Sequence, residues 1–183
     1  MSWQIFAVTT MLFWGVYGVL LHTGRLGMIA SDAGKADVAN ASMKAFLLVG
    51  AAYFVVAVVG PLIVLAKNNT NWSFTGKGVT WSFVAGTAGA IGAFTLILAL
   101  AAANRVGSSP AAVMSIVFGG APIINSIVAL SIHPPEGGFK AIPVPFFVGI
   151  LMAACGGFLV AKFSPSNAAA KKPVAAVAPG AQH

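Results

Sequence analysis

The sequence predicts an all-α polytopic membrane protein with five transmembrane helices. Of its 183 residues, 58% are hydrophobic and only 7% are charged, whereas a soluble domain carries about 25% charged residues. Five stretches lack Asp, Glu, Lys and Arg altogether, namely 1–24, 45–66, 78–104, 106–135 and 141–161. Each is long enough to supply the ~20 apolar residues with which a helix crosses the hydrocarbon core. These observations exclude an ordinary soluble enzyme and a disordered chain.

The stretches are expected to be helices because backbone groups in lipid must be hydrogen-bonded within the chain. They are also too long and too continuous to be the strands of a barrel. The five spans are predicted at Gln4–His22, Ala45–Ala66, Val79–Ala103, Pro110–Ile132 and Val144–Ala161.

The first two spans are separated by a long loop. The N-terminus lacks the basic n-region of a secretory signal, so the first span is expected to be retained. The loop from Thr23 to Lys44 has room for a short helix before the second span. Gly60 and Pro61 predict a kink near the end of that span, because proline has no N–H group to donate.

Turn residues delimit the last three spans. Gly107 suits the residue after a helix, Ser109 an N-cap and Pro110 the first helical residue. We therefore expect spans three and four to form an antiparallel hairpin. Pro143 and Pro145 mark the start of the fifth span in the same way.

The basic residues predict the orientation of the chain. Three lie on one side of the predicted spans, namely Lys67, Lys77 and Lys140. Seven lie on the other side, namely Arg25, Lys35, Lys44, Arg105, Lys162, Lys171 and Lys172. The positive-inside rule then places the N-terminus outside and the C-terminus in the cytoplasm, in an inner (plasma) membrane. The membrane domain is predicted over residues 1–163, and residues 164–183, rich in Ala, Pro and Lys, are expected to form a disordered cytoplasmic tail.

Polar and glycine-rich positions inside the spans mark a candidate substrate path. No Asp, Glu, Lys, Arg or His lies in mid-span, which disfavours a small multidrug antiporter with an intramembrane carboxylate. Span four contains Gly119-Gly120, Pro122 and Asn125, and Pro122 is expected to break the helix there. A Gly/Pro-interrupted helix near mid-membrane is typical of a transporter binding site. The alternative is a packed kink in which Asn125 bonds a neighbouring helix.

Other spans add aromatic walls, hydroxyl groups and small residues. The full set of candidate path residues is Trp14, Tyr17, Thr95, Ser115, Pro122 and Asn125. The aromatic residues would form walls, and Thr95, Ser115 and Asn125 would form hydrogen bonds. Small residues let membrane helices approach closely, and the predicted packing positions are Gly89, Gly149, Ala153 and Gly157.

Several of these motifs resemble the five-helix repeat of EamA-type drug/metabolite transporters. Trp14-Gly15 resembles the Trp-Gly that opens such a repeat, and Gly86 to Pro122 resembles its third and fourth spans. Glu136 stands roughly where the family carries a glutamate, and Gly149 to Gly157 is similar to its final glycine-rich helix. The resemblance covers about residues 5–163. Full-length members resemble two such repeats in inverted orientation with substrate between them, so the resemblance implies a half-size member that dimerises.

The predicted function is therefore transport of a small, mostly neutral or amphipathic metabolite by alternating access. The partner would be a second copy or another half-size repeat of opposite orientation, within the lipid bilayer. The alternative is a non-transporting membrane subunit or scaffold of a larger complex. An enzyme, a cofactor, a metal site and a nucleic-acid partner are not expected, because the chain has no nucleophile with a base, no metal cluster and no phosphate-binding loop.

Overall fold

The computed structural model describes residues 2–165 and confirms the all-α fold with five candidate membrane spans. The spans are Trp3–Gly27, Lys35–Lys67, Gly76–Arg105, Pro110–Ile132 and Val144–Phe163. The chain divides into two compact units, one within Met1–Ala102 and one within Ala103–His183. Most of the predicted tail, residues 166–183, lies outside the described residues.

The first unit begins with α1 (Trp3–Gly27), which continues five residues beyond its predicted end. The next helix, α2 (Lys35–Phe54), begins ten residues before the predicted second span. The long predicted loop thus shrinks to a short turn, and its expected short helix is the first part of α2. Lys44 Nζ lies 2.6 Å from Asp37 Oδ1 on this extension. An exposed pair of this kind contributes only about 0.2–1 kcal/mol.

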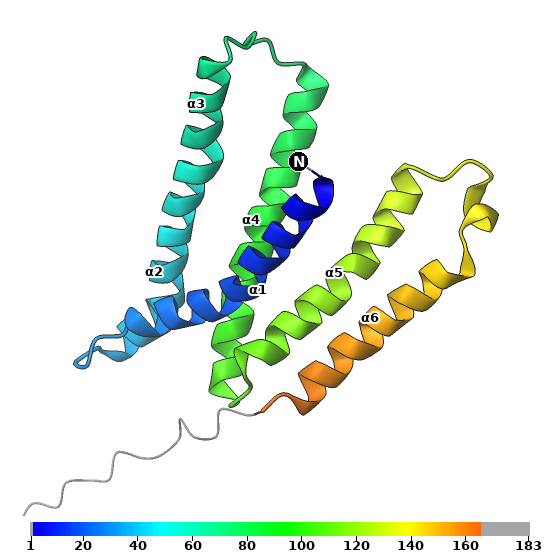
Figure 1. Ribbon diagram of the computed structural model, residues 1–183. Coiled ribbons are helices and arrows are strands. Elements are labelled where there is room, and N and C mark those ends of the chain that lie inside the picture. The colour runs from blue at the N-terminus through cyan, green and yellow to red at the C-terminus, as the bar shows by residue number, and fades with distance from the viewer. Residues whose placement is uncertain (1, 166–183) are drawn as a thin grey trace, which may run out of the picture. The chain divides into compact units, whose positions relative to one another are not determined.

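The second span changes its helical geometry before Pro61. A π-helical segment, η1 (Val55–Val59), joins α2 to α3 (Gly60–Lys67), and the Gly60 N–H donates to the Val55 carbonyl five residues earlier. Pro61 has no N–H to donate, and the wider turn absorbs the missing bond. Figure 1 shows these segments as one continuous helix, which a loop joins to α4 (Gly76–Arg105).

The core of the first unit lies where α4 carries a buried stripe. Ala93, Leu96, Ile97 and Leu100 are all buried and recur at helical spacing. Phe94, beside this stripe, stacks at a tilt on Phe46 of α2 with ring centroids 5.2 Å apart.

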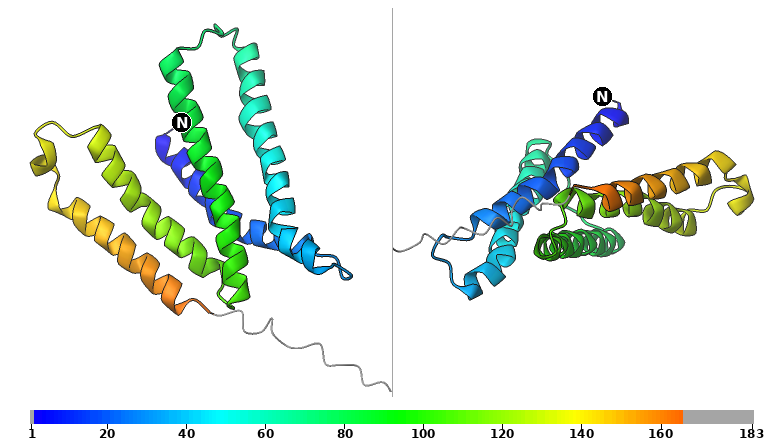
Figure 2. Two further views of the ribbon diagram at one scale, coloured as in Figure 1. Left: turned by 180° about the vertical axis from the view of Figure 1, so that it is seen from behind. Right: turned by 90° about the horizontal axis from the view of Figure 1, so that it is seen from below.

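The second unit is a helical hairpin. It consists of α5 (Pro110–Ile132), a 3₁₀ turn η2 (Gly138–Ala141) and α6 (Val144–Phe163). Both views of Figure 2 show α5 and α6 side by side, and these two helices make the main tertiary contact of this unit. Gly137 and Gly138 adopt φ values of 90° and 68° in the connecting loop, a region that suits glycine.

The predicted turn before α5 is confirmed. Gly107 has a φ of 78°, and the Ser108 N–H donates to the Ala103 carbonyl while the Gly107 N–H donates to the Asn104 carbonyl. This pair of bonds is a Schellman motif that ends α4. Ser109 then caps α5, because its hydroxyl accepts the Ala112 N–H at 3.3 Å.

Ser109 also ties the two ends of the hairpin together, since its Oγ lies 2.5 Å from Ser164 Oγ. We expect Ser109→Ala to lower the free energy of unfolding by about 0.5–2 kcal/mol, the cost of losing an N-cap. Thermal unfolding in detergent would measure this loss. Ser108→Ala is the matched control, because the bond from Ser108 to Ala103 uses its backbone N–H. Equal midpoints for the two variants would contradict the assigned cap.

Candidate functional site

A backbone contact between α5 and α6 organises the second unit. A Cβ atom added at Gly157 would lie 2.9 Å from the Ser115 carbonyl oxygen and 3.0 Å from the Gly119 Cα. One added at Gly119 would lie 3.1 Å from the Gly157 Cα and 3.5 Å from the Ala153 carbonyl oxygen. The predicted packing residues Gly157 and Ala153 therefore lie at this contact, where any larger side chain at Gly157 would separate the helices.

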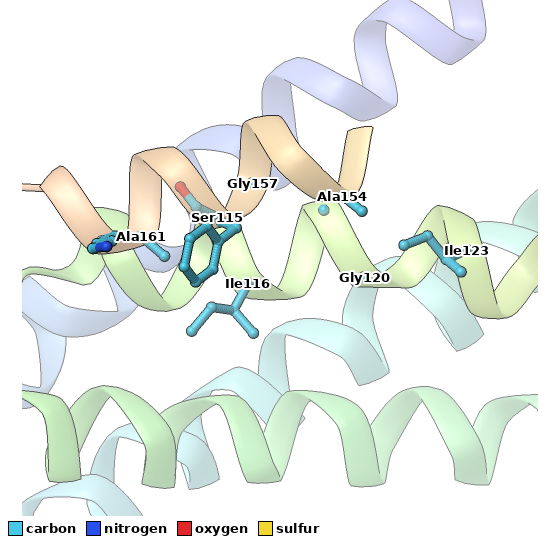
Figure 3. A pocket seen from close by; sticks show the side chains of 10 residues that line it. Ser115, Ile116, Gly120, Ile123, Ala154, Gly157 and Ala161 are labelled. Atoms are coloured by element: carbon cyan, nitrogen blue, oxygen red, sulfur yellow. The ribbon is translucent and has the colours of Figure 1, made fainter. Parts of the chain in front are cut away.

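A groove of about 470 Å³ runs along one side of this contact (Figure 3). Its volume falls within the range of about 300–1,000 Å³ that is usual for ligand pockets. It is lined from α5 by Ser115, Ile116, Gly119, Gly120 and Ile123, and from α6 by Ala154, Gly157, Phe158, Ala161 and Lys162. The glycines leave the floor without side chains, so the groove is apolar along most of its length.

One end of the groove is polar. Lys162 lies there, and its ammonium group stands 5.7 Å from the centroid of the Phe158 ring and 5.6 Å from that of Phe163. Ser115 also lines the groove, but its hydroxyl donates to the Ala111 carbonyl at 2.8 Å. The hydroxyl of the predicted path residue Ser115 is thus hydrogen-bonded within its own helix. The charge at this end of the groove comes from Lys162.

The expected break at Pro122 is absent, because α5 continues through this residue as an α-helix. Transmembrane helices tolerate proline where local adjustments compensate for the lost hydrogen bond. Asn125, one turn later, is exposed, and its side chain makes no hydrogen bond within residues 103–165 of its own unit. It lies nine residues from Ile116, about two and a half turns, and so projects from the opposite side of α5 to the groove.

Trp14 and Tyr17 are brought together in the first unit. Their ring centroids are 5.5 Å apart at an interplanar angle of 60°. The Tyr17 hydroxyl is buried and turned towards Tyr53, although the pair falls outside hydrogen-bond geometry. Tyr17 also lines a second groove of about 280 Å³, between α1 and α2, with Leu20, Leu21, Gly24, Met28, Ala45, Leu48, Val49 and Ala52.

Thr95 belongs to α4 and is not among the residues that line the second groove. It is exposed on the side of α4 opposite the buried stripe, and its hydroxyl donates to the Ile91 carbonyl at 2.9 Å. The predicted packing residues Gly89 and Gly149 also face open space, with no atom within 4 Å of an added Cβ. The structure therefore joins Trp14 with Tyr17, and leaves Thr95, Ser115 and Asn125 on separate faces of their helices.

Sequence reasoning missed the structural setting of two basic side chains, Arg25 and Lys162. Arg25 was assigned to a loop, yet it belongs to the buried stripe of α1 with Gly18 and Leu21 and is only 6% exposed. The neighbouring His22 has a buried Nδ1 atom without a hydrogen-bond partner among the described residues. The spacing of three and four residues between Gly18, Leu21 and Arg25 places them on one face of a helix, and this pattern could have indicated the burial of Arg25 from the sequence. Lys162 was counted only for orientation.

Within residues 2–165, no group of three or more His, Cys, Asp or Glu side chains is placed to hold a metal ion. Comparison of the chain with known protein families, curated proteins and solved structures finds no match. The resemblance to EamA-type transporters therefore stays a prediction from the residues.

Proposed function

We propose that this five-helix membrane protein is a half-size transporter that dimerises to move a small metabolite by alternating access. The observation that carries the proposal is the Asn125 side chain, which is exposed on α5 without a hydrogen-bond partner among the described residues. Asn125 lies seven residues before the end of α5 at Ile132, about 10 Å along the helix axis. At that depth the side chain stands within a hydrocarbon core about 30 Å thick.

An amide in hydrocarbon is costly without a partner. Moving such a group from water to a medium that cannot hydrogen-bond costs about 4–8 kcal/mol. The Asn125 amide therefore requires a polar partner from outside its own helical hairpin, and we propose that a second subunit, water or a substrate supplies it. A polar site between two subunits near mid-membrane is the arrangement that transporters with repeated halves use.

The aromatic pair Trp14 and Tyr17 supports the same proposal, since two adjacent aromatic rings form a wall suited to a neutral or amphipathic metabolite. The partner is a second copy or another half-size chain of opposite orientation, which would complete the inverted pair that the EamA resemblance implies. The basic residues favour an N-terminus outside and a cytoplasmic C-terminus in the inner membrane.

The alternative proposal is a non-transporting scaffold subunit. It is favoured by the two grooves, both open and almost wholly apolar, because neither forms an enclosed polar passage within its own unit. If the chain is a scaffold, a different membrane protein would cover the exposed Asn125 side chain.

Orientation and association together test the proposal. Cys155 would be replaced by alanine, and Ser2→Cys and Ser166→Cys variants would be labelled with an impermeant thiol reagent in intact cells, alongside cross-linking in the membrane. We expect cross-linked dimers. Labelling at both positions would identify an antiparallel homodimer, and labelling at Ser2 alone would require an oppositely oriented partner chain. Labelling at Ser2 alone without a cross-linked half-size partner would reject the transporter in favour of the scaffold.

A further inference from the structure

We infer that the groove between α5 and α6 binds an acidic phospholipid of the surrounding bilayer, with one acyl chain along the glycine floor and the anionic headgroup at Lys162. This inference is independent of transport, because the groove and Asn125 lie on opposite sides of α5.

The length and direction of the groove match one leaflet. Its lining runs from Ser115 to Ile123 on α5 and from Ala154 to Lys162 on α6, which is about 12 Å along each helix axis. Lys162 is one residue from the end of α6 and must reach the membrane interface, because a lysine ammonium is costly in hydrocarbon. The groove therefore begins at the interface and ends near mid-membrane, as does an acyl chain. A helix of a second subunit would cross both leaflets and is a poorer match.

The lining of the groove suits an acyl chain. Gly119, Gly120 and Gly157 leave its floor open, and apolar side chains such as Ile116 and Phe158 border it. A Cβ added at Gly120 would meet no atom within 4 Å, so the space above this residue is unfilled by the hairpin itself. A void in a membrane protein that opens to lipid is filled by lipid chains, since an empty one forfeits its dispersion contacts.

The charge at the interfacial end selects an acidic headgroup. Lys162 makes no ion pair with any described residue, and its ammonium is held near two aromatic rings, Phe158 and Phe163. Arg105 lies near the same end, four residues before the N-cap of α5. Glu136, the one acidic residue among positions 103–183, lies in the loop at the opposite end of the hairpin. No carboxylate therefore neutralises this end of the described unit.

Two substitutions separate the headgroup from the chain. Lys162→Gln removes the charge, and its matched control Lys140→Gln removes an exposed charge at the opposite end of the hairpin, in η2. Gly120→Leu fills the groove, and its control Gly156→Leu adds the same side chain to α6, where an added Cβ also meets nothing within 4 Å. Gly156 is not among the residues that line the groove.

The experiment uses the full chain in nanodiscs of equal parts phosphatidylglycerol and phosphatidylcholine with identical acyl chains, and native mass spectrometry counts the lipids that stay bound. We expect the unmodified protein and both controls to retain phosphatidylglycerol preferentially. Lys162→Gln should lower that preference about fivefold, the factor for one basic residue at an anionic surface. Gly120→Leu should abolish retention of both lipids. An unchanged preference in Lys162→Gln would overturn the inference. Unchanged lipid retention in Gly120→Leu would also overturn the inference. If this variant kept its lipids but lost the cross-linked dimer, the groove would be assigned to a second copy of the chain.

Discussion

Gly157→Leu is expected to separate α5 from α6 and to destabilise the second unit by about 3 kcal/mol or more. The reason is that an added Cβ would stand 2.9 Å from the Ser115 carbonyl oxygen and 3.0 Å from the Gly119 Cα. Both are backbone atoms, which cannot rotate aside as the end of a side chain can. Inserting even one methylene group into a packed site commonly costs about 1–3 kcal/mol, and leucine adds a branched chain. Unfolding by increasing denaturing detergent would measure the loss.

Gly156→Leu is the matched control for this prediction. It places the same side chain one residue earlier on α6, where an added Cβ meets no atom within 4 Å. Replacing a helical glycine also improves helix propensity, by up to about 1 kcal/mol. We therefore expect Gly156→Leu to be neutral or slightly stabilising. Equal destabilisation by the two variants would mean that α5 and α6 do not meet at Gly157.

The spans and turns were predictable because each depends on local chemistry. Charge-free stretches of sufficient length fix where helices cross the membrane, and Ser109 and Gly107 act through their own hydrogen bonds and dihedral angles. The start of α2 at Lys35 was missed because the apolar stretch that predicts a membrane span begins ten residues later than the helix itself. Asp37 and Lys44 stand seven residues apart on one helical face, and their pairing was the available signal.

The two prolines show why the position of a helix irregularity was harder to predict. Pro122 was expected to break its span and Pro61 to kink its span weakly, yet α5 is continuous and the π-helical segment precedes Pro61. Proline removes one hydrogen bond in either place. The sequence shows where that bond is lost, but the rest of the helix decides whether a bend, a wider turn or neither absorbs the loss.

The groove could not be predicted because it depends on which faces of two helices meet. Small residues on span five predicted a close contact, and Gly157 makes one with Gly119. The space beside that contact arises because the next positions, Gly120 and Ala154, are also small. Their effect emerges only once the register of α5 against α6 is known. Asn125 was identified from its polarity and its place one turn after Pro122 within a single span, and neither depends on the register between two helices.

Asn125→Leu is expected to abolish transport and to weaken dimerisation without lowering the yield of folded protein. Leucine is similar in size, and the amide makes no hydrogen bond within the α5–α6 hairpin, so the substitution breaks no hydrogen bond there. Interhelical hydrogen bonds in membranes contribute about 0.6 kcal/mol on average and at most about 1.7, so the dimer dissociation constant should rise about 3-fold to 18-fold. Cross-linking measures the dimer, and untargeted metabolite profiles of producing cells measure transport.

Two further variants make the Asn125 result specific. Ser126→Ala removes a neighbouring hydroxyl that donates to the Pro122 carbonyl at 2.7 Å within its own helix, so both measurements should stay unchanged. Asn125→Gln keeps an amide group at this position and should retain part of the activity that Asn125→Leu loses. This result is expected if Asn125 acts through a hydrogen bond, and is not expected if only the size of the side chain matters. Loss of folded protein in Asn125→Leu would assign the residue to packing within the chain. A folded variant with an unchanged dimer and an unchanged metabolite profile would remove Asn125 from the proposed path, and with it the observation that favours a transporter over a scaffold.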